Sequence, residues 1–379
     1  MRICVVTAYP PWRGSLSEFG KALIDELAKS RQVREIHVIA NICEGGRSVT
    51  RNGKVILYRS WRMNSIRGPL LAFYDILRSR PSLIYLNVHL AVFGPGRLVN
   101  FLWSLLPVAL KFFRFKVVTT LHNIFERINL REAKFKDCLL NRIGLTVATG
   151  FYSLSDSIVV TMRSYVNLIR KKYGGRAVFI PHGAWFFCGQ RNPSHPSHGH
   201  HILFLGYIGP YKSMELLIEA FKLLNAEKQS VKLLFSGSIH PNYIQSGLLD
   251  KIDKGSNITY LGYVPDEKLS ELMKDVSLIA LPYATCTGTS GVLHLLASFG
   301  KPFVATDLPE FIELKREGAG ILTVKKDPKL FYWGMKKLLE DEVLYKELSR
   351  KNLEYAHSRS WDKIANEYVK LFRKILSQG

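Results

Sequence analysis

The sequence predicts an α/β protein with two domains, each built around a doubly wound parallel sheet. Three observations support this prediction. Short apolar runs typical of buried strands alternate with amphipathic helical segments along most of the chain. A segment rich in proline, glycine and serine at residues 186–200 interrupts the alternation, which then starts again. The length of 379 residues is also sufficient for two domains.

These observations divide the chain into four parts. The first domain is expected at residues 1–185, a linker at 186–200 and the second domain at 201–355. The two domains are expected to face each other across a cleft. Residues 356–379 are expected to form a helix that packs back onto the first domain. Histidines gather near the linker, but an exposed polar linker explains them without a metal site.

In the first domain, strands are expected at residues 2–7, 36–40, 55–59, 83–87, 116–121, 157–161 and 177–181. The most apolar stretch, residues 98–115, contains Pro107 and carries Lys111 and Arg114 near its end, so a membrane span is not expected. This stretch is either a helix packed on the sheet or an amphipathic helix that lies in a membrane interface.

In the second domain, strands are expected at residues 201–205, 231–235, 258–261, 278–282 and 302–305, with helices at 214–224 and 266–274 between them. After residue 321 the pattern predicts a helical tail, with helices at 330–340, 343–356 and 361–376.

Two loops at the carboxyl ends of predicted strands are candidate binding loops. After the first strand, Gly14 and Ser15 leave the backbone open to a ligand, although a simple turn would use the same residues. After residues 278–282, the turn Thr-Gly-Thr-Ser-Gly at 287–291 precedes a helix, whose first N–H groups favour an anion. The alternative is a tight turn that only caps a buried helix.

His122 follows the strand at residues 116–121, at the same kind of sheet edge. Its pKa near neutrality and its ability to donate and accept hydrogen bonds suit contact with a polar substrate. A histidine with a purely structural role would occupy the same position, and the residue alone does not decide between the two.

The positive charge is concentrated in the first half of the chain. The net charge is +22, and residues 1–185 hold 28 Lys and Arg against 10 Asp and Glu, whereas the remainder hold 25 against 21. This asymmetry favours an anionic partner such as a membrane surface or a phosphorylated acceptor, although a generally basic surface is the alternative. No helix-turn-helix, zinc-finger or RNA-binding pattern supports binding to nucleic acid.

Cysteine usage and the N-terminal residues indicate a cytoplasmic protein. The five cysteines have no paired spacing that would suggest disulfides or a zinc site. The first residues enter a strand directly, without the pattern of a signal peptide.

Seven short motifs occur in order along nearly the whole chain. They are Pro10-Pro11 with Gly14, Leu121-His122, Ile180-Pro181-His182-Gly183, Phe204-Leu205-Gly206 with Lys212 and Ala220-Phe221, Leu261-Gly262-Tyr263-Val264-Pro265, Ala297 to Pro302 with Asp307 and Pro309-Glu310, and Ser360-Trp361. In order and spacing these motifs resemble glycosyltransferase family 4, whose members have the GT-B fold of two Rossmann-like domains.

The resemblance implies a retaining enzyme that transfers a hexose from a UDP- or GDP-hexose, without a metal or other cofactor. Lys212 would pair with the diphosphate, and His122 would contact the transferred sugar. The acceptor would attack the face from which the diphosphate leaves, so no side-chain nucleophile is implied. The other donor-binding residues implied are Gly14, Ser15, Gly206, Tyr207, Ser236, Gly237, Tyr263, Val264, Thr287, Gly288, Thr289, Ser290, Gly291 and Leu295.

The sequence departs from the family pattern at three positions. Thr287 and Leu295 stand where the family usually has two glutamates, and Tyr207 replaces an arginine that usually follows the glycine at 206. Leu295 cannot accept a hydrogen bond from a ribose hydroxyl. Either nearby hydroxyls replace the carboxylates in an active enzyme, or the chain is a catalytically degenerate nucleotide-binding or partner subunit of a glycan-assembly complex.

The basic first half fits the acceptor side of such an enzyme. An anionic or lipid-linked acceptor is expected, with the protein bound peripherally to the inner face of a membrane. Residues 98–116 and the basic cluster at 127–142 are the candidate contact surfaces.

Overall fold

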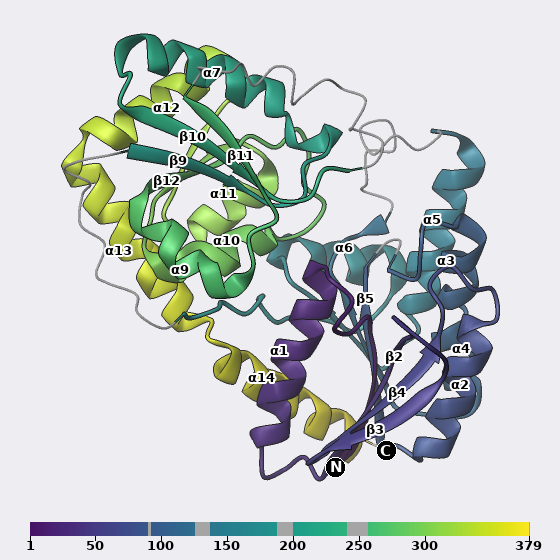
Figure 1. Ribbon diagram of the computed structural model, residues 1–379. Coiled ribbons are helices and arrows are strands. Elements are labelled where there is room, and N and C mark those ends of the chain that lie inside the picture. Colours follow the sequence, from purple (N-terminus) through teal and green to yellow (C-terminus); the bar gives the residue numbers. More distant parts are fainter. Residues whose placement is uncertain (90–91, 126–136, 188–199, 241–256, 379) are drawn as a thin grey trace. The chain divides into compact units, whose positions relative to one another are not determined.

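The computed structural model describes residues 1–89, 92–125, 137–187, 200–240 and 257–378 (Figure 1). These residues divide into two compact units. Unit 1 comprises residues 1–89, 92–125, 137–183 and 361–378, and unit 2 comprises residues 184–187, 200–240 and 257–360. Most of the predicted linker and of the basic cluster at 127–142 lies outside the described residues.

Unit 1 is built around an eight-stranded sheet with the strand order β3-β4-β2-β1-β5-β6-β7-β8. All neighbouring strands are parallel except β3 and β4. The strands are β1 (Arg2–Val6), β2 (Glu35–Asn41), β3 (Ser48–Asn52), β4 (Val55–Trp61), β5 (Leu83–Val88), β6 (Val117–Leu121), β7 (Ser157–Val160) and β8 (Ala177–Phe179). The seven strands predicted for this part are present, and β3 is an additional edge strand.

The helices of unit 1 are α1 (Ser15–Lys29), α2 (Gly68–Ser79), α3 (Arg97–Ser104), α4 (Leu106–Phe112), α5 (Leu139–Tyr152), α6 (Arg163–Tyr173) and α14 (Trp361–Ser377). The apolar stretch at 98–115 contains two helices, α3 and α4, which meet at Leu105. Pro107 lies in the first turn of α4 and lacks the N–H that would continue the hydrogen bonds of α3. Within the part of the chain that the structure describes, no helix is long and apolar enough to cross a bilayer.

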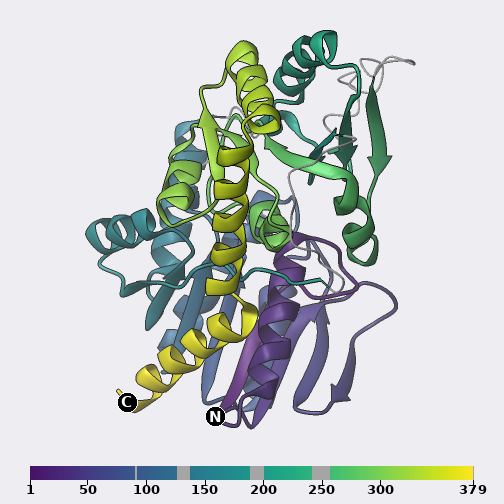
Figure 2. The same cartoon turned by 90° about the vertical axis from the view of Figure 1, so that its left-hand side faces the viewer.

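Helix α14 belongs to unit 1, although it follows unit 2 in the sequence. It begins at Trp361, five residues after the expected boundary at 356, because α13 continues to Ser358. Its buried positions recur every three or four residues, so one apolar stripe packs into the unit. Figure 2 shows α14 alongside α1, and the Tyr368 hydroxyl lies 2.8 Å from Oγ1 of Thr120 in β6.

Unit 2 is built around a six-stranded parallel sheet with the order β11-β10-β9-β12-β13-β14. The strands are β9 (His200–Leu205), β10 (Val231–Ser236), β11 (Ile258–Gly262), β12 (Val276–Leu281), β13 (Phe303–Thr306) and β14 (Ile321–Val324). The helical segments are the 3₁₀ turn η2 (Pro210–Lys212), α7 (Met214–Glu227), α9 (Asp266–Asp275), α10 (Gly291–Leu296) with the 3₁₀ turn η3 (Ala297–Phe299), α11 (Pro309–Arg316), α12 (Pro328–Glu340) and α13 (Glu342–Ser358).

One prediction for unit 2 is wrong. The chain was expected to become a helical tail after residue 321, but residues 321–324 form the edge strand β14, which pairs with β13. A strand of four residues is too short to show a clear twofold alternation.

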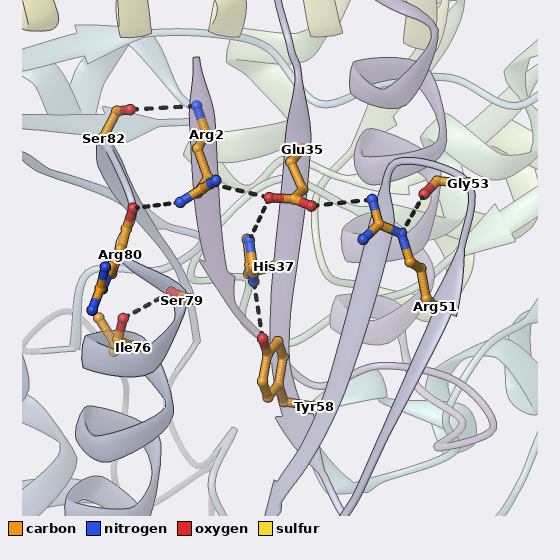
Figure 3. Close-up of polar contacts among 10 residues, drawn as sticks. All are labelled: Arg2, Glu35, His37, Arg51, Gly53, Tyr58, Ile76, Ser79, Arg80 and Ser82. Carbon is orange, nitrogen blue, oxygen red and sulfur yellow. Dashed lines mark hydrogen bonds and ion pairs between the residues drawn. The ribbon is translucent and has the colours of Figure 1, made fainter.

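A polar network joins four strands of the sheet in unit 1 (Figure 3). The Glu35 carboxylate lies 3.0 Å from Nε of Arg2, 3.1 Å from Nε2 of His37 and 3.2 Å from a guanidinium nitrogen of Arg51. His37 Nδ1 lies 3.2 Å from the hydroxyl of Tyr58 in β4. The network therefore links β1, β2, β3 and β4 at the end of the sheet opposite to the carboxyl ends of its parallel strands.

Candidate functional site

In unit 1, polar side chains gather at the carboxyl ends of three adjacent parallel strands. Thr7 follows β1, Asn87 lies near the end of β5, and His122 follows β6. The carboxyl edge of an open parallel sheet is the usual ligand-binding edge. The structure thus places His122 at the sheet edge where the sequence predicted it, beside Asn87, a partner that sequence spacing did not reveal.

His122 is held by its neighbours on two sides. Its Nε2 lies 2.7 Å from Oδ1 of Asn87, and its ring meets Phe19 of α1 edge-to-face at a centroid distance of 4.5 Å. Burial lowers the pKa of His122 well below its usual value, and the nearby His182 and His89 lower it further. His122 is therefore neutral near pH 7.

Two of the sequence motifs meet beside this histidine. The ring of His182 lies 6.3 Å from that of His122 and 5.8 Å from that of Trp361. A Cβ atom at Gly183 would lie 2.4 Å from the Trp361 ring. The motifs at 180–183 and 360–361 are thus explained by packing, because only glycine allows the tryptophan to approach so closely.

The loop after β1 exposes bare backbone, as the sequence predicted. Gly14 precedes α1 with φ of 149°, a value that favours glycine, and a Cβ there would meet nothing within 4 Å. Ser15 is exposed beside it. The guanidinium of Arg59 donates hydrogen bonds to the carbonyl oxygens of Tyr9 and Pro10 and so holds the start of this loop.

In unit 2, glycine turns follow β9, β10 and β11 at the carboxyl edge. The Gly206 amide donates to the Ser236 carbonyl at 2.9 Å, and the Gly237 amide donates to the Gly262 carbonyl at 2.8 Å. A Cβ at Gly237 would lie 1.9 Å from the carbonyl oxygen of Gly206. The structure therefore brings the predicted Gly206, Ser236 and Gly237 together, and no larger residue fits at 237.

Aromatic side chains border these turns. Tyr207 is 44% exposed, and its ring lies 5.4 Å from that of His240. Tyr263 follows the turn at 262 and is 45% exposed, and Val264 after it is half-buried. The predicted nucleotide-lining residues thus present aromatic surface to solvent, whereas Ser236 and Gly237 are buried.

Lys212 lies beside the turn that follows β12. Its Nζ lies 3.1 Å from the ring centroid of Tyr283 and 5.3 Å from that of Tyr211. The Ala284 amide donates to the Tyr211 carbonyl at 2.9 Å, which joins the two loops. Burial lowers the pKa of Lys212 to about 7, because it destabilises the ammonium form. An anion bound beside the ammonium would stabilise its charge, as the ring of Tyr283 does.

The turn at 284–290 is fixed by contacts that the sequence did not reveal. Thr289 Oγ1 lies 2.6 Å from Nε2 of the buried His294, and the Cys286 thiol donates to the Gly288 carbonyl at 3.0 Å. Burial raises the pKa of Cys286 to about 11, although the nearby charge of Lys212 acts to lower it. The thiol is therefore neutral near pH 7 and does not neutralise the lysine.

The short helix α10 positions the remaining predicted residues. Ser290 precedes it and is buried, Gly291 begins it, and Leu295 is half-buried within it. Thr287 is half-buried and Gly288 is buried in the preceding turn. Within the described residues, no group of three or more His, Cys, Asp and Glu could hold a metal ion.

Residues 199–341 match the family model described as glycosyl transferases group 1. This part of the chain is similar to group 1 glycosyl transferases. The glycine turns, Lys212 and the turn at 284–290 all lie within it. The matched residues make up less than half of the chain, and all of their described part belongs to unit 2.

Sequence relatives and solved structures extend this finding. The phosphatidyl-myo-inositol mannosyltransferase of Mycolicibacterium smegmatis is 26% identical over 213 residues, which cover 54% of this chain and 54% of that protein. The aligned part of the chain thus spans about half the length of the first curated relatives.

Two solved structures share the fold over the whole chain. Sucrose-phosphate synthase of Thermosynechococcus elongatus superposes with a TM-score of 0.77 at 14% identity and covers 100% of both chains. Alr3699/HepE of Anabaena in complex with UDP-glucose gives a TM-score of 0.71 at 16% identity, covering 99% of this chain and 100% of the other. The predicted α/β fold with two parallel-sheet domains, as in GT-B structures, is confirmed.

Proposed function

We propose that this protein is a retaining glycosyltransferase that moves a hexose from a nucleotide-diphosphate hexose to a glycan or lipid-linked acceptor without a metal. The observation that carries the proposal is the position of Lys212. Its ammonium lies beside the turn at 284–290, within the part of the chain that is similar to group 1 glycosyl transferases. The diphosphate gains negative charge as the glycosidic bond breaks, and a preorganised cation stabilises that charge.

The backbone at the carboxyl edge of unit 2 supplies the rest of the donor site in this proposal. The amides of the turn at 287–291 contact the diphosphate. The hydroxyls of Thr287, Thr289 and Ser290 replace the contacts that carboxylates would make with the donor. The glycine turns at 206 and 237, with Tyr263 and Val264, line the nucleotide. UDP- or GDP-hexose is the expected donor, in line with the UDP-glucose bound to the HepE structure.

Unit 1 contributes contacts to the transferred sugar in the same proposal. His122 accepts a hydrogen bond from a sugar hydroxyl or donates one to it. The open backbone at Gly14 approaches the sugar or its phosphate. The acceptor hydroxyl attacks the anomeric carbon from the face that the diphosphate leaves, and a donor phosphate oxygen takes its proton. The new C–O bond replaces the old one with retention, so no side-chain nucleophile takes part.

Calorimetry with UDP, GDP, ADP and their hexose derivatives tests the donor site directly. We expect one nucleotide family to bind and its sugar to be transferred. Lys212→Ala should lower the transfer rate at least tenfold, which corresponds to about 1.4 kcal/mol of lost stabilisation. Lys222→Ala, on an exposed position of α7, is the matched control and should leave the rate unchanged.

Two results would contradict the proposal in different ways. Binding of a nucleotide without transfer or hydrolysis of any sugar would favour a degenerate nucleotide-binding or partner subunit, for which the absence of carboxylates at 287 and 295 is the specific argument. No binding of any nucleotide would contradict both functions.

We also propose that unit 1 binds an anionic membrane surface, where a lipid-linked acceptor would be found. Helices α3, α4 and α5 pack together in unit 1 (Figure 1), and large apolar side chains on them face solvent. The exposed side chains are Leu98, Phe112, Phe113, Leu139 and Leu140, with exposed fractions between 57% and 82%. The exposed Arg114 and the half-buried Lys116 lie close by in the sequence. Apolar groups beside cations suit an anionic lipid interface.

Co-sedimentation with phosphatidylglycerol vesicles tests this surface. Binding is expected at low salt and should be lost at high salt, where surface charges are screened. A Phe112→Ser and Leu140→Ser double variant should bind less, whereas Val343→Ser, which removes an 80% exposed side chain from α13 in unit 2, should bind as the wild type does. Absence of binding at low salt would contradict the proposal.

A further inference from the structure

We infer that Asn87 is a positioning residue, which holds the proton of the neutral His122 ring on Nε2 and leaves Nδ1 to accept a hydrogen bond from a substrate hydroxyl. The role of the hydroxyl rests on the proposed function, whereas the placement of the proton rests on the contacts of unit 1 alone. These contacts form a chain of hydrogen bonds that can run in only one direction.

The direction is set at a backbone carbonyl. Thr7 Oγ1 lies 2.9 Å from the carbonyl oxygen of Ala8, which can only accept, so the hydroxyl proton points toward Ala8. The same hydroxyl lies 2.9 Å from Nδ2 of Asn87. Because its single proton is already used, Thr7 must accept here and Asn87 must donate.

The amide orientation of Asn87 then determines the state of His122. The second proton of Nδ2 is directed to the carbonyl oxygen of Leu16 at 3.4 Å. Oδ1 therefore faces His122 Nε2, at 2.7 Å, and it can only accept. His122 Nε2 must carry a hydrogen, and in a neutral imidazole the other nitrogen, Nδ1, then has the free lone pair.

Burial and packing hold this series of hydrogen bonds in place. Thr7 and Asn87 are both fully buried, so water does not compete for their hydrogen bonds. A Cβ at position 20 would lie 2.9 Å from Thr7 Oγ1, so Gly20 of α1 leaves room for the hydroxyl. Asn87 belongs to β5, and Thr7 and His122 directly follow β1 and β6. These three strands are adjacent and parallel, with Leu86 opposite Val6 and Thr120 opposite Asn87.

The chemical consequence is that His122 selects a hydroxyl donor and not an anion. Two titratable groups act on the charge of His122, namely His182, which lies after β8 in the sequence, and His89, which follows β5. Both disfavour a positive charge on His122. Burial acts in the same direction. A neutral acceptor at this edge would orient one hydroxyl of a sugar, while charge stabilisation of the diphosphate is left to other groups.

Nitrogen NMR of the full-length protein labelled with ¹⁵N-histidine tests the inference. The long-range proton–nitrogen pattern distinguishes the two tautomers, and a His122→Gln spectrum identifies the signals. At pH 7 to 8 we expect His122 with its proton on Nε2. A wild-type pattern with the proton on Nδ1 would overturn the inference.

Asn87→Asp supplies a second readout that a merely structural role would not change. A carboxylate beside Nε2 favours the imidazolium, so the pKa of His122 should rise by at least one pH unit, a tenfold change in its proton affinity. Asn41→Asp is the matched control, because Asn41 is also fully buried in the same sheet but bonds to the Tyr9 amide at 3.1 Å. An unchanged pKa in Asn87→Asp would overturn the inference.

These readouts separate the inference from the proposed function. If His122 shows the expected tautomer and no nucleotide sugar is used, the role of Asn87 in placing the proton stands and the proposed function fails. If transfer is found and the tautomer is the opposite one, the proposed function stands and the role of Asn87 fails.

Discussion

Lys212 shows how the surroundings of a side chain set its chemistry. An exposed lysine is protonated far above neutral pH, whereas burial lowers the pKa of Lys212 to about 7. The cationic form faces the ring of Tyr283, which comes from a different loop. The charge of this residue is therefore sensitive to small changes of pH in the range in which most enzymes are assayed.

Donor affinity should depend on pH through this lysine. Below about pH 7 the ammonium is present in the free protein, and above it the group must take up a proton to pair with a diphosphate. The dissociation constant for the nucleotide diphosphate should therefore rise about tenfold per pH unit above pH 7.5. In Lys212→Arg the charge persists, so calorimetry between pH 6.5 and 9 should give a nearly constant affinity. A wild-type affinity that does not change with pH would contradict the prediction.

Leu295 offers a test at a neighbouring position. The resemblance to family 4 implies that a glutamate here would bind ribose hydroxyls, and Leu295 is half-buried on α10. Wild-type protein should distinguish UDP from 2′-deoxy-UDP only weakly. Leu295→Glu should increase that preference about five- to tenfold, the value of one hydrogen bond of about 1 kcal/mol. Leu295→Met, which has no comparable acceptor, should behave as the wild type does in the same calorimetry.

The sequence revealed some residues of the candidate site but not their partners. Gly206, Gly237 and Lys212 stand at recognisable positions after strands, and the structure brings the two glycines together. The pairs His122–Asn87 and Lys212–Tyr283 join residues 35 and 71 positions apart. Spacing in the sequence contains no signal for such pairs, because they depend on which strands become neighbours in the sheet.

At the scale of single elements, most buried strands were predictable, whereas the exposed strand β3 and the short strand β14 were not. The twelve strands predicted from apolar runs are present. β3 was missed because all five of its residues are exposed and no apolar pattern marks it. The break between α3 and α4 lies next to Pro107, the proline that argued against a continuous membrane span.

The network around Glu35 should stabilise unit 1 without affecting the candidate site. Burial raises the pKa of Glu35, but the hydrogen bond from His37 and the charges of His37, Arg2 and Arg51 outweigh burial and lower it overall. Glu35→Gln should reduce the free energy of unfolding by about 1–2 kcal/mol in urea titrations at pH 7, because it weakens several charge-assisted hydrogen bonds.

The pH dependence of this effect has a definite sign. Because the folded pKa of Glu35 is lowered, its contribution is present above the unfolded pKa and is lost as the pH falls through the folded pKa. The difference between wild type and Glu35→Gln should therefore shrink below about pH 4. Glu26→Gln, which removes an ion pair with the exposed Lys29, is the control and should change stability by less than about 0.5 kcal/mol. Equal effects of the two substitutions would contradict the prediction.

At the scale of the whole molecule, the fold class and the division into two parallel-sheet units were predictable from the alternation of strands and helices. The charge asymmetry was also visible in the sequence, since 28 of the 53 Lys and Arg lie in residues 1–185 with only 10 of the 31 acidic residues. The membership of α14 in unit 1 depends on tertiary packing, which the alternation of strands and helices does not specify.

Helix α14 should contribute strongly to the stability of unit 1. Phe372 is fully buried and lies 5.8 Å from the rings of both Tyr85 and Tyr368. Phe372→Ala should lower the free energy of unfolding of unit 1 by about 3–5 kcal/mol, since it removes a large ring and leaves a cavity. Lys370→Ala, at an exposed position of the same helix, should have little effect. A urea midpoint that does not differ between the two variants would contradict this prediction.

The position of α14 in the sequence also determines the order in which the units are completed on the ribosome. All described residues of unit 2 lie before Trp361, whereas unit 1 needs the helix that begins there. During synthesis, at roughly 5–20 residues per second, unit 2 therefore has its full sequence before unit 1 does. Until α14 emerges, the face of unit 1 that carries Tyr85 and Thr120 stays uncovered, so unit 1, whose sheet is made before that of unit 2, is the last to finish folding.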